Sequence, residues 1–308
     1  MHNVELLAPA RDLEELKINI DNGADAVYIG GEVFGMVSQN KDFSKEQMVE
    51  GIDFAHKKGS KVYVAVNIIP HNEDFIAVEN YLKQLEEIGV DAVLISDPGM
   101  LNIVKNTIPK MEIHLSDQAN TTNYVTAKFW HEQGIKRIVA SRELSCEEIA
   151  QIRAKTPLEM DIEVFVHGTM TLSYSGRRLI SNYITDQNLD KKINKKSYNL
   201  VEEKRPGEYF PVYEDERGTF LFNSQDLCMI EYIPQLIKAG IKSFKIEGKM
   251  KDSKYVEQVV KAYRAAIDEF YKNPQGWEFN PMWLGELKKI SDRQFTAGFY
   301  LGNPCDKK

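Results

Sequence analysis

The hydrophobic and polar positions of the chain repeat one pattern, in which a glycine separates an amphipathic stretch from a short apolar run. The pattern occurs at Gly23, Gly59, Gly89, Gly134 and Gly240. Before each glycine the apolar residues recur at helical spacing, and after it β-branched and aromatic residues run together as in a buried strand. Glycine suits the end of a helix because the chain enters a left-handed conformation there. Each occurrence therefore predicts a helix, a tight loop and a strand.

Apolar runs of this kind alternate with predicted helices along most of the chain. Such alternation indicates a parallel sheet. Eight units predict an α/β fold in which the sheet closes as a (β/α)8 barrel, since no glycine-rich dinucleotide loop follows the first strand. The predicted strands are Val4–Leu7, Ala26–Ile29, Lys61–Val66, Ala92–Ile95, Glu112–Leu115, Arg137–Ala140, Ile162–Val166 and Ser243–Ile246.

The interval between the seventh and eighth predicted strands is much longer than the others. It leaves an insertion over His167–Gly240. In a barrel this loop lies on the face where active sites form, so we expect the insertion to serve function. The predicted organisation is a barrel over residues 1–272 that contains this insertion, followed by a C-terminal extension over residues 273–308 that packs on the barrel.

Composition restricts the class of protein. A hydrophobic fraction of 43% over 308 residues is enough to form a core and excludes a disordered chain. Cys146, Cys228 and Cys305 are too few and too scattered for a disulfide framework or a paired-cysteine metal site. No apolar run reaches the about 18 residues of a membrane span, and the first residues do not resemble a signal peptide. We therefore expect a cytoplasmic protein.

Charge is segregated along the chain. The whole protein has a net charge of −7, yet the stretch over residues 177–205 is basic. Tyrosines, such as Tyr174 and Tyr198, are interleaved with these cations. The stretch is either a solvated loop or a surface that binds RNA or phosphate. Its basic residues are Arg177, Arg178, Lys191, Lys192, Lys195, Lys196, Lys204 and Arg205.

Polar and charged side chains follow the carboxyl ends of most predicted strands, where barrel proteins carry out their chemistry. Such groups can perform general acid–base catalysis or bind a small anion. Arg142, His167 and Glu247 would meet at one rim, where titratable groups need partners. Together with these three, the positions hold Asn67, Asp97, Asp117, Gln118, Glu143 and Lys249.

Several of these residues also fit a structural role. Asp97 precedes Pro98 and Ser145 precedes two glutamates, so both are expected to cap helices. His167, Asp97 and Glu247 could hold a divalent metal, but no HxH or HExxH spacing supports this, and we predict no metal site. Cys146 lies in a predicted helix and fits a core residue better than a nucleophile.

Ordered motifs run along nearly the whole chain. They are Asp97–Gly99, Arg142–Ser145, Glu163–Gly168, Tyr174–Arg177, Ser181–Tyr183, Asp226–Cys228, Lys245–Lys251 and Phe295–Tyr300. These motifs resemble those of the collagenase-like peptidase family U32, which implies a barrel-type fold. Members are named as proteases, and one branch hydroxylates the wobble uridine of tRNA in a reaction that depends on prephenate and an iron–sulfur cluster.

The chain departs from this pattern at the cysteines of the hydroxylation branch. Thr171, Arg178 and the region Ile193–Ser197 stand where such members carry cysteines, and Cys228 remains. A lone thiolate cannot hold a four-cysteine cluster, so we expect none in this chain. The chain is similar to short, cysteine-poor members that occur beside a longer cysteine-bearing paralog. The resemblance therefore implies one component of tRNA wobble-uridine 5-hydroxylation, with tRNA and that paralog as partners and a prephenate-like anion as a ligand.

The resemblance and the strand ends together give candidate roles. Two alternatives stay open, namely a cytoplasmic peptidase and a non-catalytic scaffold for the paralog, and it stays open whether the chain is itself an enzyme. The candidate catalytic residues are Arg142, Glu143, His167, Lys245 and Glu247. The candidate substrate-binding residues are Asn67, Asp97, Gln118, Tyr174, Arg177 and Lys249. The candidate nucleic-acid-binding residues are Arg178, Lys191, Lys192, Lys195 and Lys196.

Overall fold

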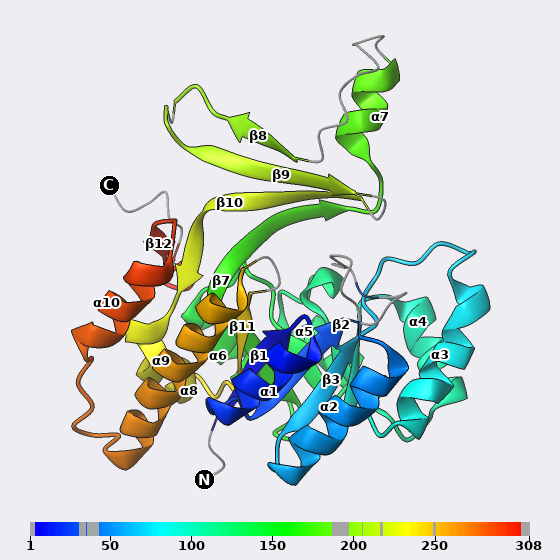
Figure 1. Ribbon diagram of the computed structural model, residues 1–308, viewed down its shortest axis with the longest axis horizontal. Helices are drawn as coiled ribbons and strands as arrows, with labels where there is room; N and C mark the ends of the chain where they lie inside the picture. The colour runs from blue at the N-terminus through cyan, green and yellow to red at the C-terminus, as the bar shows by residue number, and fades with distance from the viewer. Residues whose placement is uncertain are drawn as a thin grey trace.

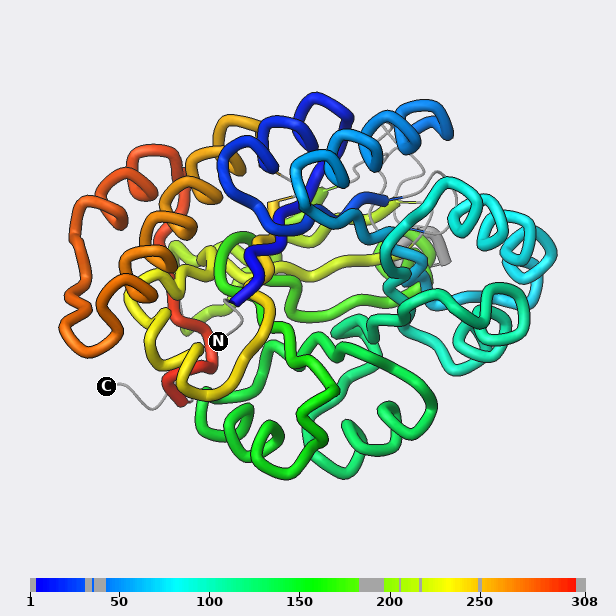
Figure 2. Tube along the Cα trace, turned by 90° about the horizontal axis from the view of Figure 1, so that it is seen from below, coloured from blue at the N-terminus to red at the C-terminus, as the bar shows by residue number. Residues whose placement is uncertain are grey.

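The computed structural model describes residues 4–30, 35, 43–186, 197–204, 206–215, 218–248 and 251–302. Within these residues, eight parallel strands close into a barrel, because β11 pairs with both β7 and β1 (Figures 1 and 2). The barrel that the sequence predicts is thus confirmed. Its strands are β1 (Glu5–Ala10), β2 (Ala26–Gly30), β3 (Lys61–Ala65), β4 (Ala92–Ile95), β5 (Glu112–Leu115), β6 (Arg137–Val139), β7 (Asp161–Ser175) and β11 (Ser243–Glu247).

Helices surround the barrel and cover its outer face (Figure 2). The glycines of the repeated pattern end these helices as predicted, with φ of +100° at Gly23, +77° at Gly59, +81° at Gly89, +90° at Gly134 and +81° at Gly240. The helices are α1 (Leu13–Asp21), α2 (Lys45–Lys57), α3 (Phe75–Glu87), α4 (Pro98–Thr107), α5 (Tyr124–Glu132), α6 (Cys146–Lys155), α8 (Ile233–Lys238) and α9 (Ser253–Lys272), with short 3₁₀ turns at Asp117–Ala119 and Ile230–Tyr232.

The expected helix caps are present. Asp97 Oδ1 accepts from Met100 N at 3.0 Å at the start of α4. Ser145 and Glu148 form a reciprocal capping box at the start of α6. Both side chains therefore satisfy backbone groups that the first turn of a helix leaves unpaired.

The seventh strand does not end near Val166, as the sequence suggested, but continues to Ser175. Beyond the barrel it pairs antiparallel with β10 (Gly218–Cys228), which pairs with β9 (Tyr209–Asp215) and then β8 (Ser197–Val201). We call β8, β9, β10 and the outer part of β7 the insertion sheet. This sheet stands over the carboxyl ends of the barrel strands, with α7 (Leu179–Asp186) at its far end (Figure 1).

Gly168 explains why the sequence suggested an early end for β7. Its φ is +106°, and a Cβ there would lie 1.7 Å from the carbonyl oxygen of Glu247. Only glycine permits this approach of β7 to β11. The glycine therefore marks a sharp change of direction inside one long strand rather than a strand end.

After α9 the chain forms α10 (Pro281–Ile290) and β12 (Phe295–Thr296), which pairs with β10. Tyr300 is buried, and its hydroxyl donates to the carbonyl oxygen of Phe165 at 2.6 Å. Asp226 of β10 is fully buried and pairs with Lys251 at 2.8 Å and with Arg293 at 3.1 Å. The insertion sheet, the loop after β11 and the C-terminal segment are thus joined at one carboxylate. Among the described helices, none has the length and apolar character needed to span a bilayer.

Candidate functional site

A small pocket lies at the carboxyl ends of the barrel strands, the side of the barrel over which the insertion sheet stands (Figure 1). We call it the mouth pocket. Side chains of the barrel strands form its walls, and Phe220 of β10 covers it from the insertion sheet. The pocket is lined by Tyr28, Asn67, Leu94, Ser116, Asp117, Gln118, Arg142, Phe165, Thr171, Phe220, Lys245 and Glu247.

Arg142 is held rigidly at one side of the mouth pocket. Its Nη2 lies 2.7 Å from Asp117 Oδ2, and its Nη1 donates to the carbonyl oxygen of Thr171 at 2.5 Å. The guanidinium also lies 4.5 Å from the ring centroid of Phe165, within cation–π range. These three contacts fix the fork of Arg142, the group best suited to bind a carboxylate or phosphate.

Lys245 approaches the same aromatic ring from β11. Its Nζ lies 5.3 Å from the ring centroid of Phe165 and 4.4 Å from that of Tyr28. The side chain is 4% exposed and forms an ion pair with Glu163 Oε1 at 3.2 Å. Two cations therefore flank Phe165 at the floor of the mouth pocket.

A buried charge network below the pocket holds Lys245 in place. Glu163 is 1% exposed and also pairs with Arg137 at 3.2 Å. Burial alone would raise the pKa of Glu163, but the charges of Lys245 and Arg137 outweigh it and lower that pKa. Arg137 reaches Glu5 at 2.5 Å, and Ser243 Oγ donates to both Glu5 and Glu163. Glu163 thus stays ionised and fixes the position of the ammonium group.

Hydroxyl, carboxylate and amide groups complete the lining of the mouth pocket. The Tyr28 hydroxyl donates to the carbonyl oxygen of Ile246 at 3.0 Å and lies 3.3 Å from Glu247 Oε2. Burial, and next the charge of Glu247, raise the pKa of Tyr28 well above its usual value, so the phenol stays protonated. Asn67 Nδ2 donates to Gln118 Oε1 at 3.0 Å. The pocket therefore combines cations for an anionic ligand with neutral donors and acceptors that can orient it.

His167 does not lie at the mouth, which corrects the prediction that it lines the barrel rim. It is fully buried, and its Nε2 and Nδ1 lie 3.0 Å and 3.4 Å from the hydroxyls of Tyr255 and Tyr263 in α9. Burial, and next the charge of Lys251, lower the pKa of His167 to about 3. The register of β7 against β11 shifts at this point, so that Ile246 faces His167. This irregularity turns the side chain outward, against α9.

The remaining candidates that the structure describes do not line the mouth pocket. Glu143 is exposed and is not part of the pocket lining, and Asp97 caps α4. Tyr174 packs on Phe220 in the insertion sheet at a centroid distance of 4.8 Å. Arg177 and Arg178 are exposed in the turn between β7 and α7. The candidates that lie outside the described residues are Lys249, Lys191, Lys192, Lys195 and Lys196.

Sequence reasoning missed two residues that shape the pocket, Phe165 and Phe220. Asp117 was among the polar residues found after the fifth strand, but no sequence pattern assigned it a role, and the structure makes it the partner of Arg142. Phe165 alternates with residues on the outer face of β7, and this period-two pattern could have placed it inside the barrel. No sequence signal identifies Phe220, because the insertion sheet brings it over the mouth from a distant segment.

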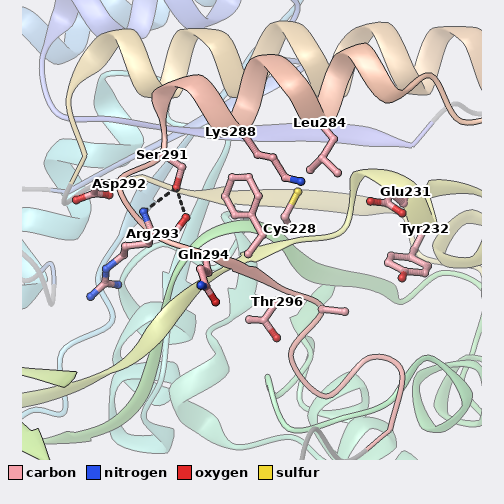
Figure 3. Close-up of a pocket in the computed structure, with 12 residues that line it drawn as sticks. Cys228, Glu231, Tyr232, Leu284, Lys288, Ser291, Asp292, Arg293, Gln294 and Thr296 are labelled. Atoms are coloured by element: carbon pink, nitrogen blue, oxygen red, sulfur yellow. Dashed lines mark hydrogen bonds between the residues drawn. The ribbon is translucent and has the colours of Figure 1, made fainter. Parts of the chain in front are cut away.

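A second cavity of about 640 Å³ lies away from the mouth, between η2 (Ile230–Tyr232), α10 and the segment that leads into β12 (Figure 3). Figure 3 shows the Lys288 amine directed toward Cys228 Sγ. Burial is the main cause that raises the pKa of the Cys228 thiol to about 11, which keeps the sulfur protonated and poorly nucleophilic. Across the described residues, no three or more His, Cys, Asp or Glu side chains gather as a metal site.

The fold and the mouth pocket define a (β/α)8 barrel protein whose long loop after the seventh strand covers the site. The chain belongs to peptidase family U32, since the model described as "Peptidase family U32" matches residues 11–308. It is 38% identical to tRNA hydroxylation protein P1 of Bacillus subtilis (strain 168), over 97% of this chain and 71% of that protein. It is 34% identical to tRNA hydroxylation protein P2 of the same strain, over 98% of both chains.

The solved structures agree with this fold. The structure of the U32 peptidase Mk0906 superposes with a TM-score of 0.50 at 13% identity, and covers 81% of this chain and 95% of that one. At that identity the likeness concerns the fold alone.

Proposed function

We propose that this chain is a component of the machinery that 5-hydroxylates the wobble uridine of tRNA, and that it acts with a paralog that carries an iron–sulfur cluster. The observation that carries the proposal is the mouth pocket, in which Arg142 and Lys245 flank Phe165 beneath the insertion sheet. The names of the relatives P1 and P2 supply the reaction class.

In this proposal the mouth pocket binds a small carboxylate of the prephenate type. The Arg142 fork and the Lys245 amine bind the negative charge, and the Asn67–Gln118 amide pair orients the polar part of the ligand. Glu247 and the Tyr28 hydroxyl, whose proton is donated to the carbonyl oxygen of Ile246, supply acceptors next to it. Lys249, which follows Glu247 in the sequence, is proposed to contribute at the same rim.

Arg177 and Arg178 are proposed to contact RNA phosphates. Both are exposed in the turn at the outer end of β7, on the side of the barrel where the mouth pocket opens. The lysines at positions 191, 192, 195 and 196 follow in the same insertion and would add phosphate contacts. Tyr174 lies near this turn and would stack on a base or support the turn.

The donor set does not fit an iron–sulfur cluster, and we derive no step through one. The chain has three cysteines, whereas a cluster of this kind takes four thiolates. The Thr171 backbone, at one position of the family's cysteines, accepts a hydrogen bond from Arg142. The thiols of Cys146 and Cys228 both have pKa values raised by burial. We therefore assign the cluster to the paralog.

A peptidase is the rival that the family name suggests. It would need an activated nucleophile or a metal-bound water. In the described part of the chain, an activated nucleophile is provided neither by the thiols of Cys146 and Cys228, whose pKa values burial raises, nor by His167, which is turned away from the mouth. Wobble-uridine hydroxylation remains the function that the mouth pocket supports best.

The test is mass spectrometry of tRNA nucleosides from the source organism with and without this gene. Loss of the 5-hydroxyuridine derivatives, restored by the wild-type gene on a plasmid, is the expected result. A parallel strain lacks both this gene and the paralog gene, because compensation by the paralog would otherwise hide the effect of the single deletion. Unchanged nucleosides in the double deletion would refute the proposal.

A further inference from the structure

A further pocket lies next to the mouth pocket, and we call it the side pocket. Its volume is about 230 Å³. The strands β7, β8, β9 and β10 of the insertion sheet supply part of its lining, and the loop after β11 and the segment before β12 supply the rest. Its lining includes Thr169, Ser197, Tyr213, Phe222, Lys251 and Arg293.

The side pocket adjoins the mouth pocket along two strands. Thr171 and Phe220 line the mouth pocket, whereas Thr169 and Phe222 line the side pocket. Side chains two residues apart on a strand lie on the same face of the sheet. The rings of Phe220 and Phe222 are parallel within 10°, with their centroids 6.3 Å apart. A chain molecule that places one unit at the mouth pocket can therefore place a neighbouring unit in the side pocket.

The part of the side pocket that the insertion sheet supplies is aromatic. Tyr213 of β9 is half-buried, and Phe222 of β10 is buried with its ring at the lining. Aromatic rings bind nucleobases by stacking, and every base can take part because each has a π face. The hydroxyls of Thr169 and Ser197 lie at the same pocket and can donate to or accept from the edge of a base. This lining suits a planar ring with polar edges.

The other part of the lining carries two cations that one buried carboxylate positions. Lys251 Nζ lies 2.8 Å from Asp226 Oδ2, and Arg293 Nη1 donates to Asp226 Oδ1 at 3.1 Å. Asp226 is fully buried, while both cations reach the side pocket. Figure 3 shows the guanidinium of Arg293 directed away from Cys228. A guanidinium has five N–H groups, so donors remain on Arg293 for a phosphate.

The rim and the size of the side pocket favour one unit of a polymer. Ser197 is exposed at the rim, and the side chain of Asp292 is 81% exposed there. The volume lies below the roughly 300–1,000 Å³ of pockets that enclose a drug-sized ligand. Lys251 and Arg293 outnumber the single carboxylate of Asp292 in the lining, so an anionic group is favoured.

We propose that the side pocket binds one unpaired nucleotide of the tRNA, whose base lies against Tyr213 and Phe222 and whose phosphate binds Lys251 and Arg293. The assignment rests on the function proposed above, and it adds where the chain holds a nucleotide beside the mouth pocket. Asp226 keeps both cations in place before the RNA arrives, so little side-chain entropy is lost on binding. Stacking on protein rings needs an unpaired base, as in the loop that contains the anticodon.

The first test is binding of a fluorescently labelled anticodon stem–loop RNA to the purified full-length protein, measured by anisotropy. Tyr213→Ala removes the stacking ring and is expected to weaken binding roughly five- to 100-fold. Tyr213→Phe keeps the ring and is the matched control, expected to bind within about twofold of wild type. Urea unfolding of both variants checks that the fold persists. If Tyr213→Ala bound the stem–loop as tightly as Tyr213→Phe, the proposal would be overturned.

The second test changes charge alone, at an exposed position. The hydrogen bond from Lys251 lowers the pKa of Asp292, so this carboxylate is ionised at neutral pH and opposes a bound phosphate. Asp292→Asn is expected to strengthen stem–loop binding about two- to fivefold. Glu159→Gln removes the same charge from an exposed loop before β7, at the far end of the barrel, and is expected to leave the affinity unchanged. Equal effects of these two variants would overturn the proposal.

Two further measurements separate the source of the nucleotide and the reaction. Uridine 5′-monophosphate is expected to compete only weakly with the stem–loop; binding as tight as that of the RNA would overturn the assignment and indicate a free nucleotide. If the deletion strain loses its 5-hydroxyuridine derivatives while Tyr213→Ala leaves stem–loop binding unchanged, the side pocket assignment fails and the proposed function stands. Unchanged nucleosides in the double deletion, together with weaker binding by Tyr213→Ala, would refute the reaction and support the side pocket.

Discussion

At the scale of single residues, the cationic candidates that reach the mouth pocket are those that have a carboxylate partner. Lys245 is a buried cation and Arg142 a half-buried one, and each has a carboxylate partner, Glu163 and Asp117 respectively, that fixes its position. His167 is buried without such a partner, so burial keeps it neutral. Strand position supplied Arg142 as a candidate, and the motif Lys245–Lys251 of the family resemblance supplied Lys245; both line the pocket. Strand position misplaced His167, because a register shift in β7 reverses the side on which the residue points.

The burial of His167 predicts an acid-dependent loss of stability. Its pKa is about 3 in the folded protein and near 6.5 in the unfolded chain, so the unfolded state binds the proton first as pH falls. The contribution is fully present above pH 6.5 and is lost below it, with a slope approaching about 1.4 kcal/mol per pH unit. The difference in the free energy of unfolding between pH 7 and pH 5.5, measured by urea unfolding, gives this loss. His167→Gln cannot titrate and is expected to show the smaller difference; equal differences would contradict the account.

At the scale of elements, the repeated glycine pattern was a sound guide to the barrel. Each of its strands was predicted, because αβ units are encoded locally by a helix period, a glycine and a buried apolar run. The insertion sheet was not predicted in the same way. Its pairing with the barrel spans a long sequence interval, as between Thr219 of β10 and Ser175 of β7, and no local pattern specifies such a partner. Phe220 enters the mouth pocket through this pairing and was missed for that reason.

Gly168 is the element-scale position where a small change is expected to have a large effect. Alanine there combines a φ of +106° with a Cβ 1.7 Å from the Glu247 carbonyl oxygen, so β7 and β11 would have to separate. We expect a loss of at least about 3 kcal/mol in the free energy of unfolding. Gly59→Ala is the matched control, with φ of +77° and no atom within 4 Å, and about 1 kcal/mol is expected. If urea unfolding gave similar losses for the two variants, the close approach of β7 to β11 at Gly168 would be contradicted.

At the scale of the whole molecule, the insertion sheet places exposed arginines on the side where the mouth pocket opens (Figure 1). The account therefore requires RNA to approach that side. The opposite end of the barrel, where α2 ends at Lys57 and a loop carries Lys110, is not expected to take part.

The salt dependence of tRNA binding tests this orientation. Each phosphate that a cation of the protein neutralises adds roughly 0.7–0.9 to the steepness of log K against log salt. R177A/R178A is therefore expected to reduce the slope by about 1–2. K57A/K110A removes the same charge from the far end and is expected to leave the slope unchanged. A slope that responds equally to both variants would contradict the proposed approach.

The central claim is that the mouth pocket carries the contribution of this chain to uridine hydroxylation. The direct measurement is the amount of 5-hydroxyuridine derivatives in tRNA from the deletion strain, complemented with Arg142→Ala, Arg142→Lys or wild type at equal protein abundance. Arg142→Lys keeps a cation beside Asp117 but loses the fork. The account predicts near-complete loss with alanine and partial loss with lysine. Full modification with Arg142→Ala would contradict it and favour a scaffold without a working pocket.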